Sequence, residues 1–598
     1  MLPEASGVSV AAPVDIRCNA ASHHSRLARR GVSGGRRRAR LFTVYILIAY
    51  VALLMTPKAL KAKDFPADQI QKWTVLELRF QSSSRQTRPF TEVWLELLFR
   101  SPSGKEQMID GFWDGGNSWK VRFSPDEEGA WQYKVVSSPA FETAWKDASG
   151  TFHCIPYSGT NPLYTRGALR VSANRRYLEQ ADGTQFFWLS DTAWNGPLKA
   201  DPKSWAEYLR DRQEKGFTAV QFVATQWLAA ASDRTGNVAY STDGSFSIHP
   251  EFFRNMEERI AEINDHGMFA AAVLVWDVNP GIHSAALDPG SCLSDADLIA
   301  LVKYQIARFG AFQVVWILAG DGDYWAENAV RWRTVGRHVF DKGPKRLVTL
   351  HPAGLQWIPA EIAAEPWFDF VTYQSGHGDS DNDLQWLTSG PPSKNWEYPP
   401  VHPTVNLEPN YEGHLSFEGR KPFDAHAVRR AAYWSLLNSP VAGVAYGAHG
   451  IWSWETAPNI PMNHENTGIA PAWSTALHLP GSTDMRHLRD FFAGLHWWTL
   501  RPANALLYEQ PGERDPSEFV MAARSEEEGW ALVYLPVGQS IRLRYEAFGA
   551  SSVVRWFDPR TGAWSERKAL ESSGEISAPD TNDWVAWIGK ASATAQPE

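Results

Sequence analysis

Two carboxylates in the middle of this chain follow apolar runs and have the residue types needed for acid–base chemistry. Asp321 comes after the run 314–319, and Glu408 comes directly after the run 401–407. Two carboxyl groups can divide one reaction, because one donates a proton while the other, ionised, attacks carbon or activates water. Cleavage of a glycosidic bond uses such a pair. The sequence therefore predicts a glycosidase-type site around Asp321 and Glu408.

Two neighbouring acids compete for these roles. Asp323 lies two positions beyond Asp321, and Glu412 lies further into the loop that follows Glu408. Aspartate is also common in turns and glutamate in structural ion pairs, so position alone does not assign the chemistry. The choice between Asp321 and Asp323 as the acid stays open at this point.

Further polar and aromatic side chains follow the other apolar runs, and their types are suited to binding a sugar. Histidines and amides can hydrogen-bond hydroxyls, and indoles offer flat apolar faces to sugar rings. Each also has a structural interpretation, since a lone histidine is often a hydrogen-bonded structural group and Asp191 can cap a helix. The predicted substrate-binding residues are Asp191, Trp194, Trp276, His351, Tyr373, Gln374, His377, Tyr446 and Trp452.

The elements that must position these side chains alternate between strand and helix from residue 166 to residue 502. Eight apolar runs of strand length recur there, separated by amphipathic stretches such as 205–215 and 252–265. This alternation predicts an α/β (β/α)8 TIM barrel, whose active site lies at the carboxyl ends of its strands. The predicted strands are 186–190, 219–224, 269–276, 314–319, 347–350, 368–373, 401–407 and 441–446.

Regions on both sides of the predicted barrel have the pattern of small antiparallel sheets. Short alternating runs split by Gly, Pro and Asn turns occupy residues 70–155 and again residues 503–590. Such spacing is typical of β-sandwiches. We therefore expect an N-terminal and a C-terminal β-sandwich flanking the catalytic barrel.

The first 62 residues have the pattern of an export signal. A cluster of arginines between residues 26 and 40 precedes an uncharged run over 41–55, and a site with small residues at Ala59 and Ala62 follows. The run is shorter than the ~20 residues that span a bilayer. We expect an exported protein, periplasmic, secreted or at the cell surface. Its contact with the membrane would be limited to this signal, or to an anchor if the signal is retained.

The charge and composition of the chain exclude some classes of binding partner. The whole chain carries a formal charge of −9, and the leader contributes ten basic and only two acidic residues, so the remainder is more acidic still. This balance argues against nucleic-acid binding, and no nucleotide or metal motif indicates a cofactor. The expected partner is a carbohydrate. Of the three cysteines, Cys18 belongs to the leader, and Cys154 and Cys292 could pair.

Several of these motifs resemble the apiosidase-like family of barrel glycoside hydrolases. The matching stretches are 317–321, 374–377, 406–413 and 446–452. The region 73–153 is similar to the β-sandwich that often precedes such barrels. The region 503–590, with its segment Trp556–Gly562, is similar to a module labelled as collagen-binding.

The resemblance implies a retaining glycosidase with Asp321 as acid/base and Glu408 as nucleophile. The family commonly has Gly-Gly-Asp where this chain has Ala319-Gly320-Asp321. Two other functions compete with a hydrolase: a non-catalytic carbohydrate-binding or adhesion protein on a barrel scaffold, and a polysaccharide lyase. Carboxylates at both strand ends favour the hydrolase, because a lyase would give the glutamate no clear task.

Overall fold

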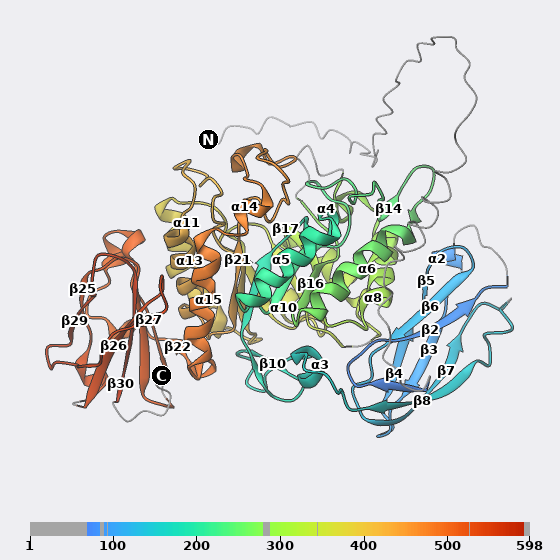
Figure 1. Cartoon of the computed structure of the whole chain (residues 1–598), viewed down its shortest axis with the longest axis horizontal. Coiled ribbons are helices and arrows are strands. Elements are labelled where there is room, and N and C mark those ends of the chain that lie inside the picture. Colours follow the sequence, from blue (N-terminus) through green and yellow to red (C-terminus); the bar gives the residue numbers. More distant parts are fainter. Residues whose placement is uncertain are drawn as a thin grey trace, which may run out of the picture.

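The computed structural model describes residues 68–590, apart from 84–88, 93, 141, 279–286, 344, 526 and 550. The predicted export segment 1–62 lies outside the described residues. Figure 1 shows a central barrel with one β-rich module beside it at each end of the chain. In the described residues, no helix has the length and apolar character needed to cross a bilayer.

Eight parallel strands form the centre of the molecule, as the apolar runs predicted. The sheet order is β18-β17-β16-β13-β12-β21-β20-β19. Backbone and side-chain bonds join the two strands at the ends of this order, including Asp369 N to Val348 O at 2.9 Å and Thr349 Oγ1 to Phe370 O at 2.7 Å. The strands are β12 Trp188–Thr192, β13 Ala219–Val223, β16 Phe269–Val273, β17 Val314–Gly322, β18 Val348–Pro352, β19 Val371–Gln374, β20 Thr404–Glu408 and β21 Gly443–Gly447.

Amphipathic helices surround the strands and bury their apolar faces against them. Asp201 shows why one helix begins where it does: its carboxylate accepts from the amides of Lys203 and Ser204, and Pro202 takes the first helical position. The longer helices are α5 Pro202–Glu214, α6 Pro250–Asp265, α8 Asp295–Phe309, α9 Ala326–Val339, α11 Asp381–Ser389, α13 Ala425–Leu437 and α15 Pro480–Ala493. Shorter ones are α3 Pro162–Arg166, α4 Gly196–Lys199, α10 Ala360–Ala363 and α14 Trp473–Ala476.

The N-terminal module has two antiparallel-rich sheets packed over an aromatic core. Phe99 and Phe123 stack with centroids 4.2 Å apart, next to the fully buried Trp131. One sheet has the order β1-β8-β7-β3-β4 and the other β2-β6-β5. Their bounds are β1 Gln69–Gln71, β2 Leu76–Gln81, β3 Glu96–Arg100, β4 Glu106–Asp110, β5 Phe112–Trp113, β6 Ser118–Phe123, β7 Gly129–Ser137 and β8 Ser149–Ile155.

The C-terminal module is also antiparallel and has its own core. Its larger sheet runs β22-β23-β24-β30-β26-β27 with β28 beside β26, and β25 pairs with β29. The bounds are β22 Arg501–Pro502, β23 Met521–Ser525, β24 Trp530–Leu535, β25 Ser540–Arg542, β26 Ser552–Asp558, β27 Ala563–Trp564, β28 Lys568–Ala569, β29 Glu575–Ser577 and β30 Trp584–Lys590.

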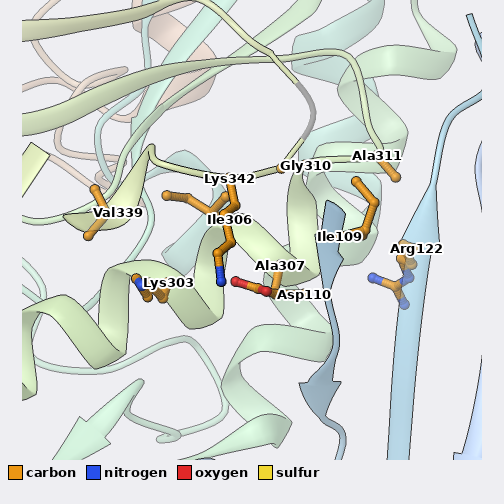
Figure 2. A pocket seen from close by; sticks show the side chains of 11 residues that line it. Ile109, Asp110, Arg122, Lys303, Ile306, Ala307, Gly310, Ala311, Val339 and Lys342 are labelled. Carbon is orange, nitrogen blue, oxygen red and sulfur yellow. The ribbon is translucent and has the colours of Figure 1, made fainter. Parts of the chain in front are cut away.

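Buried ion pairs attach both modules to the barrel. Arg122 of β6 contacts Glu257 of α6 at 2.6 Å, and Arg429 of α13 contacts Asp583 at 2.7 Å. Figure 2 shows the edge of the first interface, where a cavity of about 20 Å³ lies between the module and α8. Asp110, Lys303 and Lys342 line that cavity. Such contacts fix the modules as parts of one packed body.

The possible pairing of Cys154 with Cys292 does not occur. Cys154 is a free, buried thiol in β8 of the N-terminal module. Burial raises the pKa of this thiol to about 12, so it is held protonated. The barrel therefore gains no covalent link to the N-terminal module through this cysteine.

Candidate active site

A cavity of about 470 Å³ opens at the carboxyl ends of the barrel strands. Asp321, at the end of β17, and Glu408, at the end of β20, both line it. The structure thus brings the two predicted carboxylates to one cavity, because the carboxyl ends of parallel barrel strands all meet at the same face. Of the other predicted residues, Trp194, Trp276, Gln374, His377 and Trp452 also line it.

Glu408 is held between two imidazoles. His377 Nε2 lies 3.0 Å from Oε1, and His351 Nε2 lies 3.2 Å from Oε2. Burial by itself would raise the pKa of Glu408, but the contacts with His351 and His377 outweigh it and hold the pKa well below its ordinary value. Glu408 is therefore ionised at neutral pH.

The backbone fixes which nitrogen of His377 faces the glutamate. The amide of Tyr411 donates to His377 Nδ1 at 3.4 Å, so Nδ1 must be the unprotonated nitrogen. Nε2 then carries the hydrogen and donates to Glu408. His351 is fully buried behind the carboxylate and does not line the cavity. It contacts Glu408 where the sequence predicted a contact with substrate.

Asp321 lies in the opposite electrostatic environment. Its backbone φ is 60°, in the left-handed region that non-glycine residues rarely adopt, and the β17–β18 register is irregular on both sides of Gly320. Burial, followed by the negative charge of Glu408, raises the pKa of Asp321 to about 6. Below about pH 6, Asp321 therefore keeps its proton while Glu408 is ionised.

Indole rings form one wall of the cavity. Trp276 lies 5.4 Å from Trp194 and 4.4 Å from Trp227, measured between ring centroids. The Trp276 Nε1 donor is buried and has no partner within the described residues. Trp452, on the loop after β21, donates from Nε1 to His449 Nδ1 at 3.1 Å. These flat apolar faces and the donor without a partner suit a ring with hydroxyl groups.

Besides His351, three more residues predicted to bind substrate lie outside the cavity. Asp191 is fully buried and accepts from Tyr208 Oη and Arg212 Nε, both at 2.7 Å. Tyr446 Oη donates to Glu412 at 2.7 Å. Tyr373 is packed beneath the site against neighbouring indoles. Asp191 and Tyr446 are bound to internal partners and Tyr373 is buried against indoles, which corrects the expectation that these side chains line the cavity.

The two competing acids are also engaged elsewhere. Glu412 is buried and accepts from Tyr446 and from the amide of Gly481, and it does not line the cavity. Asp323 lies outside the lining and accepts from the amide of Trp325 at 3.2 Å. The cavity therefore presents Asp321 and Glu408.

Sequence reasoning missed several lining residues. They lie on loops after β13, β20 and β21, where no periodic pattern marks a side chain as facing the site. The chief ones are Trp227, Tyr411, His414, Phe417, Asn463 and His464. Tyr411 could have been suspected, because it follows Glu408 within the motif 406–413. Across the residues described, His, Cys, Asp and Glu side chains form no cluster of three or more suited to a metal ion.

Comparisons with known proteins agree on the class. The chain shares its fold with a glycoside hydrolase family 5 protein from Bacteroides vulgatus, at 20% identity and a TM-score of 0.63, covering 74% of this chain and 97% of the other. A second Bacteroides vulgatus structure, described as a putative glycoside hydrolase, has 19% identity and a TM-score of 0.65, covering 88% and 100%. No curated protein matches the chain.

The family is shown by the central region. Residues 172–499, more than half of the chain, match the family described as "Apiosidase-like, catalytic domain", so the chain belongs to that family. Residues 69–138 match a domain of unknown function, and residues 502–588 match the family described as "Putative collagen-binding domain of a collagenase". The resemblance inferred from the barrel and C-terminal motifs is confirmed.

Proposed function

We propose that the protein is an exported hydrolase that cleaves glycosidic bonds in an oligo- or polysaccharide with retention of anomeric configuration. The observation that carries this proposal is that two carboxylates line one cavity in opposite surroundings, one against two imidazoles and the other buried without them. Asp321 has a raised pKa and Glu408 a lowered one. Pairs of acids whose environments separate their pKa values divide the roles of acid and base or nucleophile.

In the first step, Asp321 donates its proton to the glycosidic oxygen while the bond from that oxygen to the anomeric carbon breaks. Glu408 attacks the same carbon through a carboxylate oxygen and forms a glycosyl ester, and the leaving alcohol departs with the proton. In the second step, Asp321, now ionised, takes a proton from water. That water attacks the anomeric carbon and releases Glu408.

The two histidines and the wall of indoles support these steps. The hydrogen bond from His377 and the contact with His351 keep Glu408 ionised and fix its direction, which prepares the nucleophile before substrate binds. The indole wall stacks on the sugar and places its anomeric carbon between the carboxylates. The family also contains apiosidase-like enzymes, so release of an apiosyl residue is one specific activity to include in a test.

An activity screen tests the proposal. The mature chain, starting at about Lys63, is incubated with plant and bacterial polysaccharides beside Glu408→Ala. Sugar release by the wild type alone supports the hydrolase, and NMR of the first-formed product then gives its anomeric configuration. Inversion would contradict the double displacement.

The match of residues 502–588 to a collagen-binding family gives the alternative of an adhesion protein a specific basis. Binding of glycan or collagen by both the wild type and Glu408→Ala without release would favour that alternative.

Export is tested by N-terminal sequencing of protein recovered from the periplasm or medium of an expressing bacterium. A mature terminus near Lys63 supports a cleaved signal.

A further inference from the structure

Two imidazoles that the proposed mechanism does not use line the cavity. His414 lies on the loop that follows β20, and His464 lies on the long segment that follows β21. They come from different loops and approach the cavity separately. Their hydrogen bonds decide what each can offer to a bound ligand.

Each ring is fixed in one tautomer by a backbone carbonyl. His414 Nδ1 lies 2.6 Å from the oxygen of Leu415, and His464 Nδ1 lies 2.7 Å from the oxygen of Met462. A carbonyl oxygen only accepts, so both Nδ1 atoms carry the hydrogen. Burial is the main cause that lowers the pKa of both rings, so they are neutral. In a neutral ring with hydrogen on Nδ1, Nε2 is an acceptor.

The two acceptors sit at different depths. The ring of His414 stacks on His377, which is the histidine that bonds Glu408, with centroids 4.1 Å apart. The ring of His464 lies against Trp452 at 4.9 Å and Trp227 at 6.1 Å, over the indole wall. Within the described part of the chain, neither Nε2 makes a hydrogen bond. One acceptor is thus near the reacting centre, and one is over the stacking surface.

The charges of the cavity point to the same kind of ligand. Its described lining contains Asp321, Glu408 and Glu465 and neither lysine nor arginine. Arg420 is close to the rim, but it is exposed and bonds the backbone oxygen of Asn466. A carboxylate or sulfate on a sugar would meet acceptors and negative charge with no cation to pair with, which disfavours it.

We propose that the site selects a neutral sugar and that Nε2 of His414 and of His464 accept hydrogen bonds from two of its hydroxyl groups. The inference rests on the proposed function, since it names the substrate class of the same site. It assigns His414 and His464 as specificity-determining residues and excludes uronic acid and sulfated residues as the sugar that binds beside Glu408.

A matched pair of variants tests the acceptor role. His464→Phe keeps an aromatic ring and removes the acceptor, whereas His464→Gln keeps an acceptor near the position of Nε2. The substrate pool is a plant cell-wall hydrolysate that contains both neutral and uronic oligosaccharides, and products are identified by mass spectrometry. We expect the wild type to release a neutral residue, His464→Phe to lose about tenfold in kcat/KM, the value of one hydrogen bond, and His464→Gln to recover most of it. Release of a uronic or sulfated residue, or equal rates for wild type and His464→Phe, would overturn the inference.

A second measurement needs no substrate. Nitrogen NMR of the full mature chain labelled at histidine reports the tautomer of each ring, and the signals are assigned with His414→Gln and His464→Gln. We expect both residues to carry hydrogen on Nδ1 only at neutral pH. Hydrogen on Nε2 of either ring would overturn the inference even in an active enzyme. No sugar release by the wild type would contradict the proposed function instead, and the tautomers would still decide this inference.

Discussion

The carboxylates of the cavity and the buried carboxylate Asp191 of the surrounding barrel have different partners. Asp191 is fully buried and paired with the equally buried Arg212 at 2.7 Å. Glu408 has the imidazoles of His351 and His377 as partners, whereas Asp321 is buried next to the negative charge of Glu408. A fixed cation locks Asp191 as a structural anion, whereas burial leaves Asp321 with a proton to donate and the imidazoles leave Glu408 ionised at the cavity. The difference separates a carboxylate that holds the barrel together from the two to which we assign the proposed chemistry.

Glu408→Ala has the largest expected effect. Removing a nucleophile should lower kcat by about four orders of magnitude or more. The barrel should stay folded, because the lost group lines a cavity and carries no core packing. Activity is measured on the substrate found in the screen, and thermal unfolding is the control for folding. Retention of wild-type turnover would remove Glu408 from the mechanism.

Asp321→Asn should lower kcat/KM by about 10²- to 10⁴-fold, the range for a general acid. The loss should be smaller on aryl glycosides with acidic leaving groups, since these depart with little protonation. The variant is compared with Asp323→Asn, which we expect to keep near wild-type rates because Asp323 lies outside the cavity. The reverse pattern would assign the acid to Asp323.

Arg212→Met tests the structural side of the comparison. It leaves Asp191 buried without its cation, so the free energy of unfolding should fall by about 3–5 kcal/mol. Denaturant unfolding followed by tryptophan fluorescence measures the change. Arg79→Met is the control, because the Arg79–Glu77 pair is exposed and such pairs contribute about 1 kcal/mol or less. Equal stability for the two variants would mean that the Asp191–Arg212 pair does not hold the barrel.

His377→Phe should have the smallest effect of the four. It removes one hydrogen bond to a charged carboxylate, which predicts a loss of about 10- to 100-fold in kcat/KM. The pKa of Glu408 should rise, so the acid limb of the pH profile should move to higher pH. His338→Phe, at an exposed position of α9, is the control. An unmoved acid limb would show that His377 does not set the charge of Glu408.

The barrel, and the meeting of Asp321 and Glu408 at one cavity, were predictable from sequence for a physical reason. Strands buried on both faces appear as continuous apolar runs, and a parallel barrel brings whatever follows each run to one end. Asp321 and Glu408 stand at such positions.

The partners of buried polar groups were not predictable in the same way. Asp191 follows an apolar run as Asp321 does, yet it is bound by Arg212 of α5. His414 and His464 reach the cavity from loops whose path depends on tertiary contacts such as Leu415 N to Thr467 O at 3.1 Å. A linear pattern contains no signal for these pairings.

The pH dependence of kcat/KM for the wild type and Asp321→Asn tests the central claim most directly. The proposed acid works protonated, and its pKa is raised to about 6, so wild-type activity should fall as the pH rises through about 6. Glu408 stays ionised over that range and adds no limb there. The account predicts that this alkaline limb disappears in Asp321→Asn. A wild-type profile that is flat through pH 6, or a limb that persists in the variant, would contradict it.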